Sequence, residues 1–200
     1  MRVKLTTIDE MLGSQPNDKE IHRTYIASKS PDVATLEEEV AAVGVDAVDE
    51  KGTTVFPRDK DGNLVVYNYQ IKGFFKSACS ALRKVPKTKS SKCKAYKKLI
   101  DLNIFVYADE SDVANRMIPI NYDGEIGTCQ RTLRAQTMQG ERISLASSEM
   151  IEAGATIEFD VVCLNEDDEE LVREWLDYGR YNGLGQWRNS GKGAFVWEEL

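Results

Sequence analysis

The sequence predicts an α+β fold in which helices cover one face of a mostly antiparallel sheet. Three observations lead to this prediction. Short stretches of β-branched and aromatic residues occur among helical apolar patterns, turns separate most of the strands, and no internal repeat is visible. With 200 residues, of which 42% are hydrophobic, the chain is long enough for one domain, residues 1–200, with a substantial core.

The first quarter of the chain predicts a strand followed by an inserted helical element. Apolar and polar residues alternate weakly from Val3 to Thr7, which suits an opening strand, and Gly13 to Asn17 is expected to be a turn. Asp18 can cap a helix over residues 19–27, and Pro31 begins a second helical stretch that is rich in glutamate. We therefore expect an added helical and acidic element over about 18–52.

The next segment predicts a turn, a short strand and a long helix. Asp61-Gly62 marks the turn. Tyr67 to Arg83 has one apolar face at helical spacing, with lysines beside it. A basic loop is expected over about 84–98. Its part from Lys87 to Lys94 holds Lys, Ser and Thr with little apolar content, so we expect that part to be mobile.

The second half predicts more strands and one further helix. Ile104–Tyr107, Met117–Ile120 and Thr156–Leu164 have the composition of strands. The region of about 122–146 is expected to form a projecting hairpin or arm. Glu169 to Tyr178 predicts a helix that turns its apolar side chains inward, namely Leu171, Val172, Trp175 and Leu176.

A glycine-rich loop runs from Tyr178 to Phe195 and leads into a last strand at Ala194–Trp197. Five glycines lie among cations and aromatic residues, which suit phosphates and bases. A Walker loop is excluded because Gly193 follows Lys192 where Ser or Thr is needed. A dinucleotide fingerprint is excluded because Arg188 stands where its third glycine is needed. The alternative is an irregular connection with glycines at its turns, and residue types alone do not decide between the two.

Charge is distributed unevenly along the chain. The net charge of −7 argues against nucleic-acid binding when it is taken as an average. However, residues 72–98 contain ten Lys or Arg and no Asp or Glu. The rest of the chain contains 16 Lys or Arg and 33 Asp or Glu. A basic patch on an acidic body is the electrostatic feature that a function has to explain.

The cysteines and the N-terminus indicate a cytoplasmic protein. The four cysteines are not closely spaced and the chain has one histidine, so we expect no metal site, no cofactor and reduced thiols. No apolar signal core follows Met1, and no apolar run approaches membrane length.

Three stretches in this order resemble the repeat-associated mysterious protein (RAMP) superfamily of CRISPR systems. The opening strand leads to a turn at Leu12-Gly13. Residues 58–78 resemble the superfamily's strand-to-helix junction, with Asp61-Gly62, a Lys72-Gly73 step and Lys76 one turn later. Residues 183–195 resemble its C-terminal glycine-rich loop. The sequence departs from the superfamily at residues 67–70, which read Tyr-Asn-Tyr-Gln where a Pro-Gly-Ser-Ser run is frequent.

The resemblance is closest to the backbone subunits that line guide RNA in effector complexes, and a phage or prophage relative would fit as well. It implies a modified ferredoxin-like (RRM-like) fold that binds single-stranded nucleic acid, RNA in preference to DNA. Free N–H groups at a Lys72-Gly73 helix start would then meet a phosphate. CRISPR effector subunits are the implied protein partners. Copies of the chain could also stack head to tail, with the basic patch of one against the acidic face of the next, into a homo-oligomer or filament. The expected contact residues are Lys72, Lys76, Arg83, Lys84, Lys87, Lys89, Lys92, Arg131, Arg134, Trp187, Arg188 and Lys192.

Two other functions stay open at this point. Some superfamily members are metal-independent endoribonucleases that process guide RNA, and His22, Tyr25 and Lys29 lie close together at helical spacing. A lone histidine without a partner carboxylate also suits a surface helix, so the sequence favours binding over catalysis. A phage-encoded protein that mimics or inhibits a CRISPR effector subunit is the other alternative, with acidic surfaces facing basic ones of the partner.

Overall fold

The computed structural model describes residues 1–17, 53–137 and 140–200. The described chain forms two compact units. The first comprises Met1–Met11, Pro57–Glu125 and Ile151–Leu200. The second comprises the described residues of Leu12–Phe56 together with Ile126–Met150. The two helical stretches expected over 18–52 lie outside the described residues. A single domain over 1–200 stays a prediction, because the structure determines each unit by itself.

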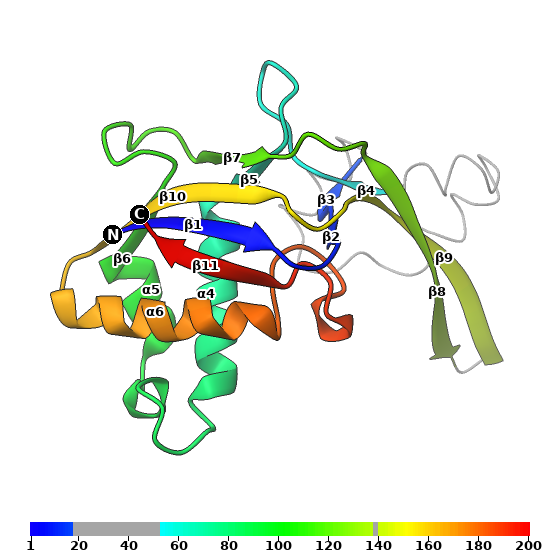
Figure 1. Ribbon diagram of the computed structural model, residues 1–200. Coiled ribbons are helices and arrows are strands. Elements are labelled where there is room, and N and C mark those ends of the chain that lie inside the picture. The colour runs from blue at the N-terminus through cyan, green and yellow to red at the C-terminus, as the bar shows by residue number, and fades with distance from the viewer. Residues whose placement is uncertain (18–52, 138–139) are drawn as a thin grey trace. The chain divides into compact units, whose positions relative to one another are not determined.

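The first unit is built on a six-stranded sheet (Figure 1). Its central strands are β1 (Arg2–Thr7) and β10 (Thr156–Cys163), which pair antiparallel. The other strands are β11 (Phe195–Glu199) beside β1, β6 (Ile104–Tyr107) and β7 (Met117–Asn121) beside β10, and β5 (Val65–Tyr67) beside β7. Every pairing in this sheet is antiparallel, as predicted.

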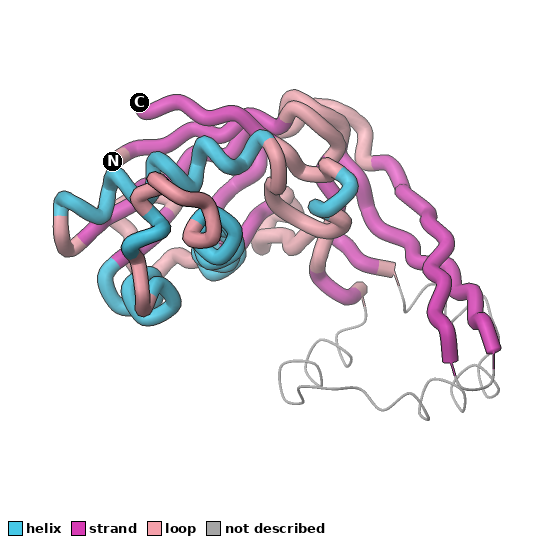
Figure 2. The backbone as a smooth tube through the Cα atoms, turned by 90° about the horizontal axis from the view of Figure 1, so that it is seen from below, coloured by secondary structure: helices cyan, strands magenta, loops and turns pink. Residues whose placement is uncertain are grey.

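The helices lie on one side of this sheet (Figures 1 and 2). They are α4 (Asn68–Leu82), α5 (Tyr96–Asn103) and α6 (Glu169–Asp177). In chain order, β1, α4 and β6 form a strand–helix–strand unit, and β10, α6 and β11 form a second one. These four strands lie in the order β11-β1-β10-β6. The mixed α+β architecture predicted from the sequence is confirmed.

The core forms because each strand and helix has one apolar side. Along β1, Val3, Leu5 and Thr7 are buried, while the alternate residues face the other side of the sheet. From α4, the Phe75 ring lies 5.6 Å from Trp175 of α6 between ring centroids. Phe74 meets Phe195 of β11 edge to face at 5.1 Å. These aromatic contacts join both helices to the sheet.

The second unit is built on the hairpin of β8 (Gly127–Thr137) and β9 (Gly140–Ile151). The two strands pair antiparallel from Gly127↔Met150 to Thr137↔Gly140, which confirms the predicted hairpin in this region. The other strands of its sheet are short: β2 (Met11–Leu12), β3 (Gln15–Pro16) and β4 (Thr54–Val55). The turn expected over Gly13–Asn17 is therefore partly wrong, because Gln15–Pro16 pair with β4.

The segment expected to be a basic loop has more regular structure than predicted. A 3₁₀-helix, η1 (Ser90–Lys92), follows α4, and α5 begins at Tyr96. The predicted pattern missed α5 because this eight-residue helix buries two residues, Tyr96 and Ile100. An amphipathic pattern of two positions is too short to distinguish a helix from a loop.

Candidate nucleic-acid interface

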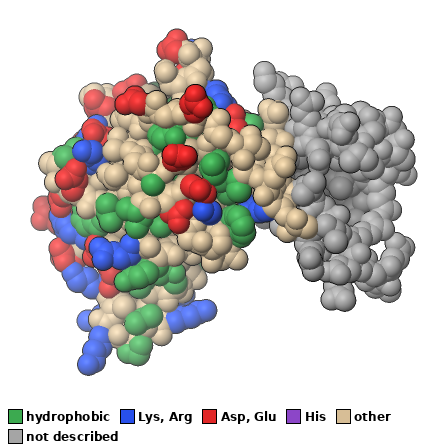
Figure 3. Space-filling model, turned by 45° about the vertical axis from the view of Figure 1, so that its right-hand side comes forward, with side chains coloured by type: hydrophobic (Ala, Val, Ile, Leu, Met, Phe, Trp, Pro, Cys, Tyr) green, Lys and Arg blue, Asp and Glu red, His purple; other side chains and the backbone are tan. Residues whose placement is uncertain are grey.

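The basic residues of 72–98, called the basic segment below, lie on α4, η1, α5 and the turns between them. Lys72 and Lys76 are half-buried on α4. The other eight cations of the segment are exposed, and no acidic residue interrupts it. Lys and Arg side chains gather at the lower end of the first unit (Figure 3), where α4 ends in Figure 1. The first predicted contact group, from Lys72 to Lys92, therefore extends along α4, the turn after it and η1.

Some of these cations already have partners within the first unit. Lys76 pairs with Asp101 of α5 at 2.6 Å, and Lys72 donates to the carbonyl oxygen of Asp101 at 3.2 Å. Lys89 pairs with Glu170 of α6. Six lysines form no ion pair with any residue that the structure describes, and they are Lys84, Lys87, Lys92, Lys94, Lys97 and Lys98. These six exposed charges are available to an anionic ligand.

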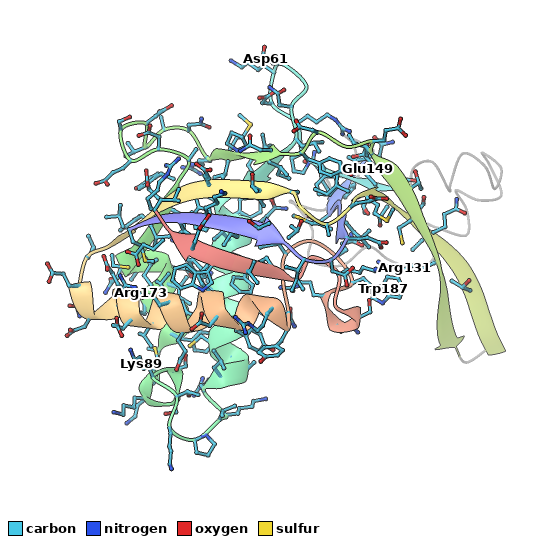
Figure 4. All side chains as sticks on the ribbon, viewed as in Figure 1. Asp61, Lys89, Arg131, Glu149, Arg173 and Trp187 are labelled. Atoms are coloured by element: carbon cyan, nitrogen blue, oxygen red, sulfur yellow. The ribbon has the colours of Figure 1, made fainter. Side chains whose placement is uncertain are left out.

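The turn between α4 and α5 carries four of these lysines and is fixed to α6. The Glu174 carboxylate accepts hydrogen bonds from the backbone N–H of Lys89 at 2.7 Å and that of Ser90 at 2.9 Å. The Ser90 hydroxyl donates to the same carboxylate at 2.5 Å and accepts from Trp175 Nε1 at 2.9 Å. Ser90 is fully buried. Figure 4 shows Lys89 beneath α6. The expectation of a mobile loop from Lys87 to Lys94 is therefore wrong at Lys89 and Ser90.

This anchor consists of groups that the sequence pattern could not connect. Glu174 lies 84 positions from Ser90, and neither residue belongs to a motif. Fixing the turn lowers the conformational entropy that the lysines lose when they bind a ligand. Its backbone also contains Lys87 at φ 71°, a left-handed conformation that is uncommon for a residue with a side chain. The anchored turn thus presents its charges in a defined arrangement.

The start of α4 differs from the one that the resemblance implies. The helix begins at Asn68, so Lys72-Gly73 lies in its second turn and not at its first residue. The expected free N–H groups at this step are therefore wrong, because backbone N–H groups inside a helix are already bonded. The Asn68 side chain donates to the carbonyl oxygen of Val106 at 3.2 Å, and Gln70 accepts from the N–H of Tyr67 at 2.7 Å. These two contacts fix where the helix begins.

The glycines of the C-terminal loop are explained by close backbone contacts. A Cβ atom on Gly183 would lie 1.6 Å from the carbonyl oxygen of Gly193. A Cβ on Gly193, at φ 71°, would lie 1.8 Å from the carbonyl oxygen of Leu184. Leu184 and Gly193 are joined by a backbone hydrogen bond at 3.0 Å. This loop is closed upon itself, and these glycines serve its folding.

Lys192 of this loop is occupied by two carboxylates. Its ammonium group lies 2.6 Å from Glu10 and 3.1 Å from Asp9. The hydrogen bond with Glu10, and then that with Asp9, raises the pKa of Lys192. A phosphate would have to compete with both carboxylates for this lysine. A structural role for Lys192 follows directly from this geometry.

The rest of the second predicted contact group is divided between the two units. Trp187 and Arg188 belong to the first unit, and Trp187 is 40% exposed in a left-handed conformation. Arg131 and Arg134 belong to β8 of the second unit. The structure describes the two units separately, so a common surface of these residues stays a prediction.

The other predicted features are outside the described residues or are absent from them. His22, Tyr25 and Lys29 lie outside the described residues. Within residues 1–17, 53–137 and 140–200, no group of three or more His, Cys, Asp or Glu residues could hold a metal ion. All four cysteines are free thiols. Among the helices of the described ranges, none is long and apolar enough to cross a membrane.

Comparison with known proteins gives a structural likeness without a sequence relative. No family model matches the chain, and no curated protein sequence is significantly similar to it. A chain in the cryo-EM structure of the type III-B Cmr-beta complex bound to cognate target RNA superposes with a TM-score of 0.51 at 10% identity. The match covers 99% of this chain and 58% of the other.

A second solved structure is more distant. Cas6 of Thermus thermophilus matches with a TM-score of 0.36 at 10% identity, covering 98% of this chain and 53% of Cas6. The likeness to the Cmr-beta chain shows a shared fold, and this chain spans 58% of the length of that neighbour.

Proposed function

We propose that this protein binds single-stranded nucleic acid, RNA in preference to DNA, through its basic segment. The observation that carries this proposal is the set of six exposed lysines without an ion pair among the described residues, four on the turn anchored to α6 and two on α5. Phosphates attract such lysines, and their binding releases counterions from the nucleic acid. The solved structure that contains the similar chain is a Cmr-beta complex bound to target RNA, which supports RNA as the ligand. A RAMP-like fold supports the same ligand.

We further propose that the first unit is a modified ferredoxin-like (RRM-like) fold. Two strand–helix–strand units with the antiparallel order β11-β1-β10-β6 support this classification. The RNA-recognition modules of this class stack bases on aromatic residues of the sheet. Here the open side of the central strands carries ion pairs instead, Arg2 with Asp160 at 3.1 Å and Lys4 with Glu198 of β11 at 3.2 Å. This difference supports contact away from the two central strands, through the helices, their turns and the edge of the sheet.

The same fold likeness supports a place for this protein beside CRISPR effector subunits, either in a complex or in a homo-oligomer. The basic segment would then line a strand of nucleic acid, in the way that RAMP backbone subunits line guide RNA. Six lysines that each neutralise one phosphate of a single strand give a slope of about −4 in log affinity against log salt. Between 50 and 200 mM salt the affinity would fall by about 300-fold.

Fluorescence anisotropy of labelled single-stranded RNA, measured over a KCl series, tests the proposal. Lys84→Gln combined with Lys92→Gln should make the slope shallower by about 1.4, because each lysine contributes about 0.7. The matched control replaces Lys60 and Arg116, two exposed cations of the first unit outside the basic segment, by Gln. Equal slopes for the two double variants would contradict the assignment of the basic segment.

A further inference from the structure

A large aromatic side chain stands exposed at the start of α4. Tyr69 is 58% exposed, and its ring is stacked on that of Tyr67 with centroids 5.2 Å apart and planes 12° apart. Tyr67 covers one side of the Tyr69 ring, and the core does not use the remaining surface. A single exposed ring is common on protein surfaces, whereas a contiguous group of exposed apolar side chains marks a candidate binding site.

A second pair of aromatic rings lies on the neighbouring strand β6. Phe105 and Tyr107 point to the same side because they are two positions apart in a strand. Their rings are parallel within 6° at a centroid distance of 6.5 Å. The hydrogen bond from Asn68 to the carbonyl oxygen of Val106 joins the start of α4 to β6. The four rings of Tyr67, Tyr69, Phe105 and Tyr107 are called the aromatic patch below.

Lys72 links the two pairs of rings. Its ammonium group lies 5.4 Å from the centroid of the Phe105 ring. Residues three apart on a helix are neighbours, so Lys72 also stands next to Tyr69. Burial lowers the pKa of Lys72, which Asp101 partly offsets. The patch thus combines stacked rings with a partly desolvated cation, a combination found at sites that bind single strands.

The aromatic patch continues into the basic segment. Tyr69, Lys72, Lys76 and Arg83 fall on one stripe of α4, since their spacing follows 3.6 residues per turn. Arg83 lies fourteen positions after Tyr69, which corresponds to about 21 Å along a helix. The unpaired lysines begin at Lys84, directly beyond this stripe. One strand of nucleic acid can therefore contact both the aromatic patch and the unpaired lysines.

We propose that the aromatic patch is a base-binding site of the same single strand whose phosphates the basic segment contacts. A base stacks on the exposed face of Tyr69 beside Lys72, and the unpaired lysines that begin at Lys84 contact the phosphates of the same strand. The proposal rests on the proposed function, because it takes its ligand from the cationic stripe. Stacking tolerates any base, so the site reads the presence of an unpaired base and not its identity.

The test measures stacking separately from charge. The probe is a single-stranded RNA that contains 2-aminopurine, whose fluorescence is quenched when it stacks, and anisotropy gives the affinity in parallel. Tyr69→Ala should weaken binding by about 5- to 150-fold and remove the quenching, as expected for one stacked base. The salt slope should stay unchanged, because no cation is lost. Tyr69→Phe should keep both signals, since it keeps the ring.

Three controls separate the outcomes. Leu102→Ala removes another exposed apolar side chain, 65% exposed on α5, and should change neither signal. An oligonucleotide with abasic spacers should bind the wild type and Tyr69→Ala equally, because it offers nothing to stack. If Tyr69→Ala is unstable, Tyr69→Gln replaces it in the test. Glutamine is a helix former without a ring, so this variant should also lose affinity and quenching.

The two proposals fail in different ways. If the wild type shows no salt-dependent binding of the RNA, the proposed function is wrong, and the base-binding site is wrong with it. If the wild type binds with the expected slope but Tyr69→Ala keeps the affinity and the quenching, only the aromatic patch is refuted. If Tyr69→Ala binds RNA as the wild type does but loses binding to another protein, the base-binding site is also refuted.

Discussion

Glu174→Ala should release the lysine-bearing turn from α6. The Glu174 carboxylate holds three donors, which are two backbone N–H groups and the Ser90 hydroxyl. Without it, buried Ser90 has two unsatisfied donors. The Ser90 hydroxyl, which accepts from Trp175 Nε1, is then no longer held by the carboxylate. The helices and the sheet keep their own contacts, so the effect should concentrate on residues 87–93.

The size of the effect follows from these hydrogen bonds. A hydrogen bond to a charged group contributes about 1.5–3 kcal/mol. Lys89 is exposed, so water can replace the carboxylate at its N–H, and two bonds at buried Ser90 remain to be counted. We therefore expect a loss of about 3 kcal/mol. Glu174→Gln keeps an acceptor and should lose about 1 kcal/mol.

Amide hydrogen exchange followed residue by residue is the assay, because it reports local opening. A loss of about 3 kcal/mol corresponds to a decrease of about 100-fold in the protection of the Lys89 and Ser90 amides. For a chain of this length the midpoint of thermal unfolding would fall by at most about 10 °C. The control is Glu152→Ala, which removes an exposed carboxylate elsewhere in the first unit.

Unchanged protection of Lys89 and Ser90 in Glu174→Ala would refute the anchor. A uniform decrease in protection across α4, α6 and β1 would also refute the anchor, because it would mean that Glu174 supports the core and not the turn. If the anchor holds, the variant should also bind RNA less tightly without a change in salt slope, since the lysines stay present but lose their fixed arrangement.

Further predictions concern glycines, a buried thiol and Lys192. Gly183→Ala should cost at least about 3 kcal/mol in unfolding free energy, because its Cβ collides with backbone. Gly73→Ala, with nothing within 4 Å of the added Cβ, should stabilise α4 by about 1 kcal/mol, and urea unfolding compares the two variants. Burial raises the pKa of Cys79 to about 11 from an ordinary value of 9.0, so its stabilising contribution is complete below pH 9 and is lost as the pH rises towards 11. The midpoint of thermal unfolding of the wild type should therefore fall more steeply over this range than that of Cys79→Ala, and equal slopes would contradict the shift. Lys192→Ala should lower the unfolding free energy by at most about 1 kcal/mol and leave the RNA salt slope unchanged; a slope shallower by 0.7 would instead make it a phosphate contact.

Local patterns were sufficient to predict most of the first unit. The alternation of β1 and the apolar faces of α4 and α6 are written in neighbouring residues, since a strand repeats every two positions and a helix every 3.6. The β8–β9 hairpin was also predicted, although the second unit as a separate body was not. Its short strands β3 and β4 pair residues about forty positions apart, which no local pattern reveals.

The contacts that shape the candidate interface depend on the fold. Lys192 meets Asp9 and Glu10 about 180 positions away, so the sequence could not show that this cation is occupied. Tyr67 and Tyr69 would point apart if both were helical, but Tyr67 precedes the first helical residue and its ring stacks on that of Tyr69. The alternation of Phe105 and Tyr107 in the predicted strand was the one signal that could have indicated the aromatic patch.

The decisive measurement is the anisotropy of wild-type protein with single-stranded RNA between 50 and 200 mM KCl. If the basic segment holds the strand, the logarithm of the affinity falls linearly with log salt at a slope of about −4, and the affinity for RNA exceeds that for DNA. Absence of binding at 50 mM salt, or binding that is independent of salt, would contradict the claim that the basic segment holds a nucleic-acid strand.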